Sequence, residues 1–445
     1  MQHLRVVRAG WSWVVGCAVV GVLGPTASVS AETLEERVER LERELTAVKH
    51  QLALEREGGT AKAEEAPVVV AGKDGFSVKS ADGSFQLKVK GHAQVDGRFF
   101  LDNEPASSTF VLRKARPIFE GTLWKDYAFR VMPDFGSGTT ILQDAYLDAA
   151  YWPEAKVRVG KFKAPFWLER LQSDPESAFI EPGLTTNLVP NRDVGVQLSG
   201  DLLGERVNYA IGVFNGVPEG GSADADSDDD KDVVARLFTH PFKGWGPVPF
   251  EGLGVGVAAS FGHRDGAPGS YRTAGQQTFF SYQSNVNADG RHLRFSPQGS
   301  YYWGPFGVLG ELVTSTQRLR RSGVTTEVDS SAWQIAASYV LTGEDASYKG
   351  INVRRPFSLK EHAWGTLELA GRFSGLWVDK DAFATLAAPS TSAQRADAWN
   401  LGLNWHLNKS VKWLFDYEQT HFNGGSDGTD RDNEQVLLTR WQVVY

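Results

Sequence analysis

Hydrophobic and polar residues alternate with a period of two along most of this chain, starting near residue 74. Successive side chains in such a pattern point to opposite faces, as in a β-strand with one apolar and one polar face. The same division recurs up to the last residues, so the pattern predicts an all-β domain over residues 74–445. Its first segment has an apolar face of Phe85, Leu87, Val89, Ala93, Val95 and Phe99 and a polar face of Gln86, Lys88, Lys90, His92, Gln94, Asp96 and Arg98.

Strand length and polar character decide which all-β architecture is favoured. A strand of a soluble sandwich also alternates, but these strands are long and their polar faces carry charges of both signs. In a membrane barrel the apolar face meets lipid and the polar face lines a watery interior. We count 16 candidate strands from Ser84 onward and one ambiguous segment at residues 276–282. Since bacterial single-chain barrels have even strand numbers, we predict a 16-stranded antiparallel transmembrane β-barrel, with 18 strands as the alternative.

The end of the chain supports a membrane barrel. Residues 437–445 alternate in the same way and stop on an aromatic residue, Tyr445. Chains of this class resemble one another in ending on an aromatic closing strand that the barrel-insertion machinery reads. We therefore expect Tyr445 to contact that machinery, and the barrel to lie among lipid and lipopolysaccharide in a Gram-negative outer membrane. An edge strand that happens to end in tyrosine is the alternative.

Residues 32–57 have a different period, with apolar residues at alternating steps of four and three. This is the heptad of a coiled coil, whose narrow apolar seam is flanked by charges. We expect the helix to end at Gly58-Gly59 and residues 58–73 to form a flexible linker. We interpret the helix as a periplasmic stalk that joins copies of the chain, while packing on its own barrel is the alternative. The seam consists of Leu34, Val38, Leu41, Leu45, Val48 and Leu52.

Residues 1–31 have the pattern of a secretory signal peptide. Two arginines precede an apolar run over residues 11–23, and small residues occupy the cleavage positions 29–31. The run is shorter than the ~20 residues that a membrane-spanning helix needs. A lipoprotein cleavage box at Cys17 is the alternative, but most of the apolar run would then follow the cleavage site. We expect an exported chain that contains no cysteine once it is mature.

Composition excludes several functional classes. A net charge of −8 is unlike the basic footprint of nucleic-acid-binding proteins. Without cysteine, the mature chain has no Cys-based catalysis, and the nine histidines show no metal-ligand spacing. No Gly-x-Ser-x-Gly nucleophile elbow occurs in the mature chain. We therefore expect no enzyme, no cofactor and no nucleic-acid partner.

Several short motifs follow one another, among them Gly83-Ser84-Phe85-Gln86-Leu87-Lys88, Leu112-Arg113-Lys114-Ala115-Arg116, Gln143-Asp144-Ala145-Tyr146-Leu147-Asp148 and Gly160-Lys161-Phe162-Lys163-Ala164-Pro165-Phe166. In this order they resemble the phosphate-selective porin family, the outer-membrane porins O and P, over residues 83–445. The resemblance implies a trimer of 16-stranded barrels that passes anions through a pore narrowed by an inward-folded loop. That loop would be residues 163–190, which contain four prolines and no strand pattern. Long loops of this kind tend to be functional or disordered.

The resemblance also implies an anion-binding site. Arginine and serine side chains can donate hydrogen bonds to phosphate oxygens, and arginine can do so with two parallel bonds. Charge at the narrowest part of a pore sets its selectivity, so cations in and beside the loop are candidates too. The family's site is matched by Arg113, Lys114, Asp144, Arg170 and Ser173, and the further cations are Lys161, Lys163 and Arg192.

Three departures argue against a dedicated phosphate channel. Pro182 and His92 stand where the family has basic residues. The family's phosphate porins also have closely spaced arginines in a later inward-folded loop, whereas the four arginines of residues 262–294 lie well apart. We therefore predict a passive trimeric diffusion channel for small anionic solutes, with phosphate or pyrophosphate preference as the narrower possibility. The alternative is a general non-selective porin that serves mainly as a structural barrel, tethered to peptidoglycan by residues 32–57.

Overall fold

The computed structural model describes residues 33–72, 75–101, 107–226, 228–425 and 430–445. The predicted signal peptide, residues 1–31, lies outside the described residues. The chain divides at Glu64 and Glu65 into two compact units, of which the first contains helix α1 and the second the β-sheet. Among the described residues, no helix combines the length and the apolar character needed to cross a membrane.

Helix α1 (Leu34–Glu65) begins with a capping box. The backbone N–H of Thr33 donates to Glu36 Oε2 at 2.9 Å, and the backbone N–H of Glu36 donates to Thr33 Oγ1 at 3.3 Å. These bonds satisfy N–H groups that have no partner within the helix. The predicted end at Gly58-Gly59 is wrong, because α1 continues through both glycines. Good helix formers surround the two glycines, and Pro67 follows the actual end.

The predicted flexible linker over residues 58–73 is also wrong in part, because it contains the end of α1 and strand β1 (Val68–Gly72). Strand β1 pairs antiparallel with β2 (Gly75–Lys79), and β2 pairs with the start of β3 (Gln86–Phe100). Three consecutive valines in β1 favour an extended backbone. They do not alternate with polar residues, so the periodic pattern gave no sign of this strand.

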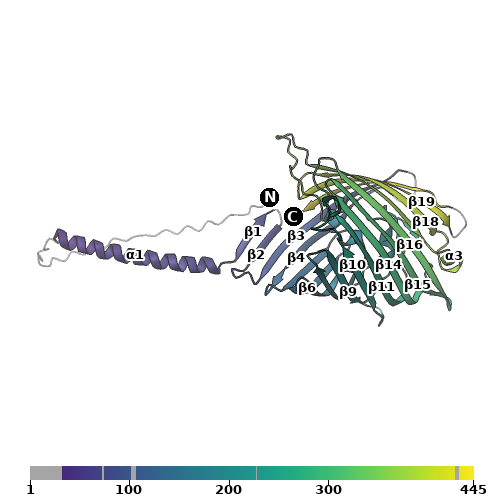
Figure 1. Cartoon of the computed structure of the whole chain (residues 1–445), viewed down its shortest axis with the longest axis horizontal. Helices are drawn as coiled ribbons and strands as arrows, with labels where there is room; N and C mark the ends of the chain where they lie inside the picture. Colours follow the sequence, from purple (N-terminus) through teal and green to yellow (C-terminus); the bar gives the residue numbers. More distant parts are fainter. Residues whose placement is uncertain (1–32, 73–74, 102–106, 227, 426–429) are drawn as a thin grey trace, which may run out of the picture. The chain divides into compact units, whose positions relative to one another are not determined.

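Sixteen strands, β3–β11 and β14–β20, form a closed antiparallel barrel (Figure 1). Each strand pairs with the next barrel strand, and the sheet closes where β20 pairs with β3. The predicted 16-stranded barrel is confirmed. The remaining barrel strands are β4 (Thr109–Leu123), β5 (Tyr127–Asp134), β6 (Ile141–Trp152), β7 (Ala155–Lys163), β8 (Arg192–Leu202), β9 (Val207–Phe214), β10 (Asp232–Thr239), β11 (Leu253–Gly266), β14 (Asn287–Trp303), β15 (Phe306–Arg321), β16 (Val324–Val340), β17 (Thr366–Trp377), β18 (Ala393–His406), β19 (Val411–Gly425) and β20 (Glu434–Val444).

The barrel strands expose apolar residues and bury polar ones. On β18, the apolar Leu403 is 41% exposed, whereas its polar neighbour Asn404 is 1% exposed. A water-soluble domain has the opposite distribution, because its apolar residues face a shared core. The exposed apolar face is the surface that contacts lipid in a membrane barrel, and the buried polar face is the interior.

The connections at the two ends of the barrel differ in length. At one end, which we name the turn end, residues 124–126, 153–154 and 304–305 are short turns. At the other, which we name the loop end, most connections are longer. Membrane barrels have short turns in the periplasm and long loops outside the cell. The turn end therefore corresponds to the periplasmic side.

Long connections of the loop end fill part of the interior. Residues 267–286 contain the short hairpin β12 (Tyr271–Arg272) and β13 (Thr278–Phe280), which occupies the segment that the sequence left ambiguous. The rings of Tyr271 and Phe280 stack with centroids 5.0 Å apart and are fully buried. Helix α3 (Asp381–Thr385) packs into the same apolar cluster through Ala382. This cluster closes one side of the lumen.

Candidate functional site

The connection between β7 and β8, residues 164–191, crosses the barrel interior, and we name it the constriction loop. At one wall, Glu311 of β15 accepts hydrogen bonds from the backbone N–H of Leu168 at 3.0 Å and from the indole N–H of Trp167. Four strands further round the barrel, Asp416 of β19 accepts the backbone N–H of Ile180 at 2.8 Å. Two separate parts of the barrel wall therefore hold the loop in place. It contains the short helices α2 (Leu168–Leu171), η1 (Asp174–Glu176) and η2 (Leu184–Leu188).

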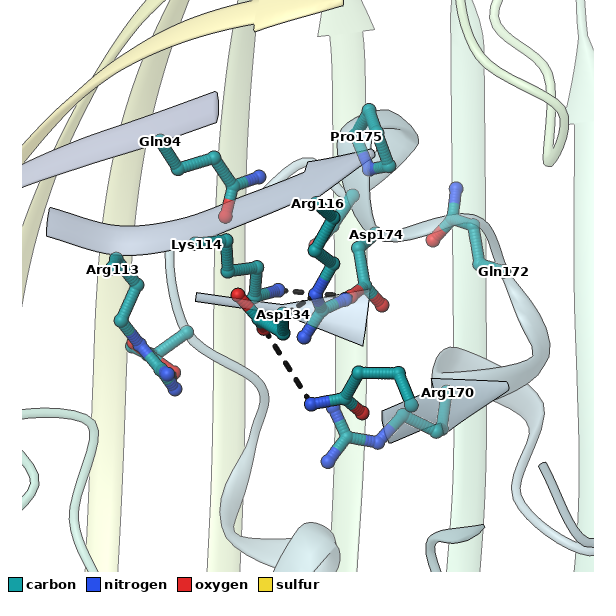
Figure 2. A network of polar contacts seen from close by, with 12 residues as sticks. Gln94, Arg113, Lys114, Arg116, Asp134, Arg170, Gln172, Asp174 and Pro175 are labelled. Atoms are coloured by element: carbon teal, nitrogen blue, oxygen red, sulfur yellow. Dashed lines mark hydrogen bonds and ion pairs between the residues drawn. The ribbon is translucent and has the colours of Figure 1, made fainter. Parts of the chain in front are cut away.

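Asp174 binds three cations of the neighbouring wall, and Figure 2 shows two of them, Lys114 and Arg116, beside it. Lys114 Nζ lies 2.9 Å from Asp174 Oδ2, Arg116 Nη1 donates to the same oxygen, and Lys163 Nζ lies 3.5 Å from Oδ1. Lys114 and Arg116 are two residues apart on β4 and so share its interior face. Burial raises the pKa of the Asp174 carboxyl, but the cations outweigh this effect and hold its pKa well below the usual range.

Glu181 is the centre of a second cluster. Arg113 Nε and Nη2 donate to its two carboxylate oxygens at 2.7 and 3.2 Å. Arg98 Nη2 and Arg440 Nη2 lie 3.5 and 3.7 Å from Glu181 Oε1. Burial raises the pKa of Glu181, but the three guanidinium groups outweigh it and lower this pKa to about 2. Glu181 is therefore ionised at neutral pH.

Each cluster includes one further acid: Asp134 binds Arg116 at 2.6 Å, and Asp96 binds Arg440 through two bonds of 2.7 Å. With these two acids included, each cluster contains one more cation than carboxylates. The low-dielectric wall focuses the remaining positive charge on the water of the passage. The first cluster consists of Lys114, Arg116, Lys163, Asp174 and Asp134, and the second of Arg98, Arg113, Arg440, Glu181 and Asp96.

Arg170 and Ser173 differ from these residues, because their side chains bind no other described residue through an ion pair or a hydrogen bond. The Nε atom of Arg170 is buried without a hydrogen-bond partner, and its guanidinium carbon lies 5.4 Å from the centre of the Trp167 ring. Burial lowers the pKa of Arg170 to about 10, so its guanidinium stays charged at neutral pH. The two residues thus offer free donors on the constriction loop.

Cavities on the two sides of the constriction loop meet at Ser173 and Asp174, which line both. The cavity towards the loop end has a volume of about 490 Å³ and includes Arg170 in its lining. The cavity towards the turn end has a volume of about 590 Å³. A third cavity, of about 640 Å³, shares Arg272 and Gln276 with the first. The shared lining residues define a path from the loop end through the constriction to the turn end.

The other predicted site residues pair among themselves or with nearby acids. Arg192 Nε lies 2.8 Å from Asp144 Oδ1, and Arg130 Nε lies 3.3 Å from Asp144 Oδ2. Lys161 Nζ binds Asp224 of the connection 215–231. Arg192 and Lys161 therefore each have a carboxylate partner, unlike Arg170.

Lys163, another predicted site residue, mainly holds the constriction loop. Its ammonium group donates to the backbone carbonyl oxygens of Arg170 and Gln172 at 2.6 and 2.9 Å. It therefore fixes the backbone on both sides of Leu171 and sets the position of Arg170 and Ser173. The structure brings Lys114, Lys163, Arg170 and Ser173 to the same constriction, with Arg113 in the adjoining cluster.

Several charged residues of the clusters are absent from the predicted site. Arg98 and Asp96 stand on the polar face of the first barrel strand, Arg116 on that of the second, and Arg440 on that of the last. Alternation marks all four as interior residues. Their grouping depends on the register between β20 and β3, where Arg440 is opposite Asp96, and on the path of the constriction loop.

A closed barrel with an apolar outer face, a polar interior and an inward loop that leaves a charged passage is the architecture of an outer-membrane porin. Among the described residues, no cluster of His, Cys, Asp or Glu is arranged to hold a metal ion.

The chain belongs to the phosphate-selective porin family, since residues 85–445 match the family described as Phosphate-selective porin O and P. It is 24% identical over 430 residues to Porin O of Pseudomonas aeruginosa, an alignment that covers 87% of this chain and 94% of that protein. The predicted family is therefore confirmed, and the barrel resides in the outer membrane of a Gram-negative cell.

Solved structures share the fold at low sequence identity. The outer-membrane channel DcaP of Acinetobacter baumannii aligns with a TM-score of 0.56 and 10% identity, covering 83% of this chain and 99% of that one. OmpT of Vibrio cholerae aligns with a TM-score of 0.52 and 13% identity, covering 85% and 100%. An anion-selective porin from Comamonas acidovorans aligns with a TM-score of 0.51 and 10% identity, covering 81% and 100%.

Proposed function

We propose that this chain forms a passive diffusion channel for small anionic solutes. The observation that carries the proposal is the free guanidinium of Arg170, next to Ser173 at the junction of two cavities. Arginine presents a planar fork of donors to an oxyanion, and serine adds a hydroxyl donor. The excess cations of the two clusters attract anions to this point and repel cations. Such a passage needs no catalytic group.

The carboxylates of the constriction favour general anion permeation over a dedicated phosphate site. Lys114 and Arg113, which match the family's phosphate site, already bind Asp174 and Glu181. A phosphate ion would compete with these carboxylates for the same donors, and separating a buried pair is costly. A preference for phosphate or pyrophosphate is the narrower form of the proposal, in which Arg170 and Ser173 hold the anion.

We also propose a homotrimer whose α1 helices associate in the periplasm. The six apolar side chains of the α1 seam are all exposed on the helix, and partner helices in a coiled coil would bury them. On the flank of the seam, Arg43 Nη2 lies 3.0 Å from Glu39 Oε2, an i,i+4 pair that supports the helix. The same stalk supports the alternative of a peptidoglycan tether. Lipopolysaccharide around the barrel and the insertion machinery at Tyr445 complete the proposed partners.

Recordings in planar bilayers test the channel. In a KCl gradient, the reversal potential should have the sign expected when chloride permeates more readily than potassium. Added phosphate should reduce the chloride current only weakly if permeation is general, and strongly if the narrower form holds. A protein that does not conduct contradicts the channel, and a reversal potential of the opposite sign contradicts its anion preference.

A charge placed in the seam tests the stalk. Leu45→Glu should reduce the fraction of trimer measured by light scattering, because the seam cannot bury a carboxylate. Thr46→Glu adds the same charge outside the seam and should leave the trimer intact. If the stalk is a tether, Leu45→Glu should also abolish co-sedimentation with peptidoglycan while the barrel still conducts. Trimers that are equally stable in both variants contradict the proposed association.

A further inference from the structure

The connection between β16 and β17, residues 341–365, is unusually long for the turn end of the barrel. Most neighbouring turns have only a few residues, such as 304–305 and 407–410. Its last part is a tight hairpin, in which the backbone N–H groups of Ser358 and Ala363 donate to each other's carbonyl oxygens at 2.9 and 3.0 Å. We name residues 358–363 the rim hairpin.

The rim hairpin lies against the outer surface of the barrel wall. The ring of Phe357 packs edge-on against Trp405 of β18 with centroids 5.3 Å apart, and Trp405 Nε1 donates to the carbonyl oxygen of Trp364 at 2.6 Å. Trp405 is on the same strand face as the exposed Leu403, whereas Asn404 on the other face is buried. Trp405 therefore faces lipid, and so does the segment that packs on it.

Neighbouring aromatic residues extend this lipid-facing surface. Trp413 of β19 stacks between Trp405 and Trp441 of β20, with ring centroids 6.3 and 4.5 Å apart. Tryptophan is enriched at membrane–water interfaces, where its ring fits the headgroup level. The row of rings places the rim hairpin at the boundary between the hydrocarbon and the headgroups of the periplasmic leaflet.

The hairpin and its neighbours combine exposed apolar groups with free cations. Leu359 is 78% exposed and Trp364 is 68% exposed. Arg355, Lys360 and Lys409 are also exposed, and none forms an ion pair with another described residue. Lys409 is close to the hairpin, because the backbone N–H of Phe357 donates to the carbonyl oxygen of Leu407 at 2.6 Å. Glu361 and His362 are the remaining titratable groups of the tip.

We propose that the rim hairpin binds an anionic phospholipid of the periplasmic leaflet. Leu359 and Trp364 insert among the acyl chains, and the side chains of Arg355, Lys360 and Lys409 reach the phosphate group. The attraction of each lysine or arginine to an anionic membrane surface is worth about 1 kcal/mol, and long cationic side chains extend to the headgroup level. Three free cations against one carboxylate stand out in a chain whose net charge is −8.

Native mass spectrometry of the full protein tests the site. The protein is exchanged into micelles that contain phosphatidylglycerol and phosphatidylcholine in equal amounts, and the bound lipid is counted. We expect preferential retention of phosphatidylglycerol. Lys360→Gln/Lys409→Gln should lower its affinity about thirtyfold, the loss expected for two charges near an anionic surface. Lys360→Arg/Lys409→Arg keeps the charges and should retain the lipid.

The control Lys79→Gln/Lys125→Gln removes two exposed lysines elsewhere in the chain and should bind lipid like the wild type. Equal retention of both lipids by the wild type overturns the proposal, and so does an equal loss in the control. Conductance of all variants should be unchanged, because the hairpin does not line the passage. A protein that retains lipid but does not conduct would therefore contradict the channel and leave the lipid site intact.

Discussion

Arg440 and Asp96 face each other across the line where the last barrel strand closes on the first. The guanidinium Nε and Nη2 of Arg440 donate to the two carboxylate oxygens of Asp96, and both bonds are 2.7 Å long. Both side chains are buried. Arg440 also reaches Glu181 of the constriction loop. A single arginine therefore links closure of the barrel to the position of the loop inside it.

Removal of Arg440 should destabilise the barrel. Arg440→Ala leaves the buried Asp96 carboxylate without its partner, which costs about 3–5 kcal/mol for a buried pair. The temperature of unfolding, measured by circular dichroism in detergent, should fall clearly. Arg291→Ala is the control, because Arg291 pairs with Glu327 on the exposed surface, where a pair contributes at most about 1 kcal/mol. Equal unfolding temperatures for the two variants would contradict the closure role.

Arg170 should contribute directly to anion selectivity. Arg170→Ala removes a charge that forms no ion pair with another described residue, and a unit charge in water is worth about 1 kcal/mol at contact distance. The ratio of chloride to potassium permeability, from reversal potentials, should fall roughly fivefold. Lys125→Ala removes an exposed charge from the turn 124–126 and should not change the ratio. An unchanged ratio for Arg170→Ala would remove the main support for the proposed anion path.

Asp174 should limit the affinity of the constriction for oxyanions. Asp174→Asn frees Lys114, Arg116 and Lys163 from their carboxylate partner. Each released charged donor can then bind a solute oxygen, and one such bond is worth about 1.5 kcal/mol. Phosphate should inhibit the chloride current at roughly tenfold lower concentration. Asp345→Asn, which removes an exposed carboxylate near the turn end, should leave the inhibition unchanged. Weaker phosphate inhibition in Asp174→Asn would show that the carboxylate helps to organise the site.

Glu181 should make stability depend on pH in the acid range. Its pKa in the folded protein is about 2, below the ordinary value of 4.5. A lowered folded-state pKa stabilises the protein fully above pH 4.5, and the contribution is lost as the pH falls towards about 2. The difference corresponds to about 3 kcal/mol. Unfolding measured between pH 2 and 6 should show a gap between wild type and Glu181→Gln that narrows on acidification. A gap that is constant with pH would contradict the lowered pKa.

The alternation of residues predicts the barrel but not its internal contacts. Leu401 and Leu403 lie on one face of their strand, and Asn400 and Asn404 lie on the other. This alternation predicts both that the segment is a strand and which of its faces points into the barrel. The two residues of the Arg113–Glu181 pair are 68 positions apart. That contact depends on how the constriction loop crosses the lumen, which no short pattern encodes. Gly58-Gly59 predicts the end of a helix, but the good helix formers on both sides of the two glycines allow α1 to continue to Glu65.

Glu311 should control the width of the passage from the wall opposite the cation clusters. It accepts the backbone N–H of Leu168 at 3.0 Å and the indole N–H of Trp167. Glu311→Ala leaves these buried donors unpaired, at about 1–3 kcal/mol each, and releases one attachment of the constriction loop. Single-channel conductance should rise and its noise increase. Glu311→Gln keeps an acceptor oxygen and should preserve most of the wild-type behaviour, whereas Glu327→Ala, at the exposed surface, should have no effect. An unchanged conductance in Glu311→Ala would mean that Asp416 and the remaining contacts hold the loop without it.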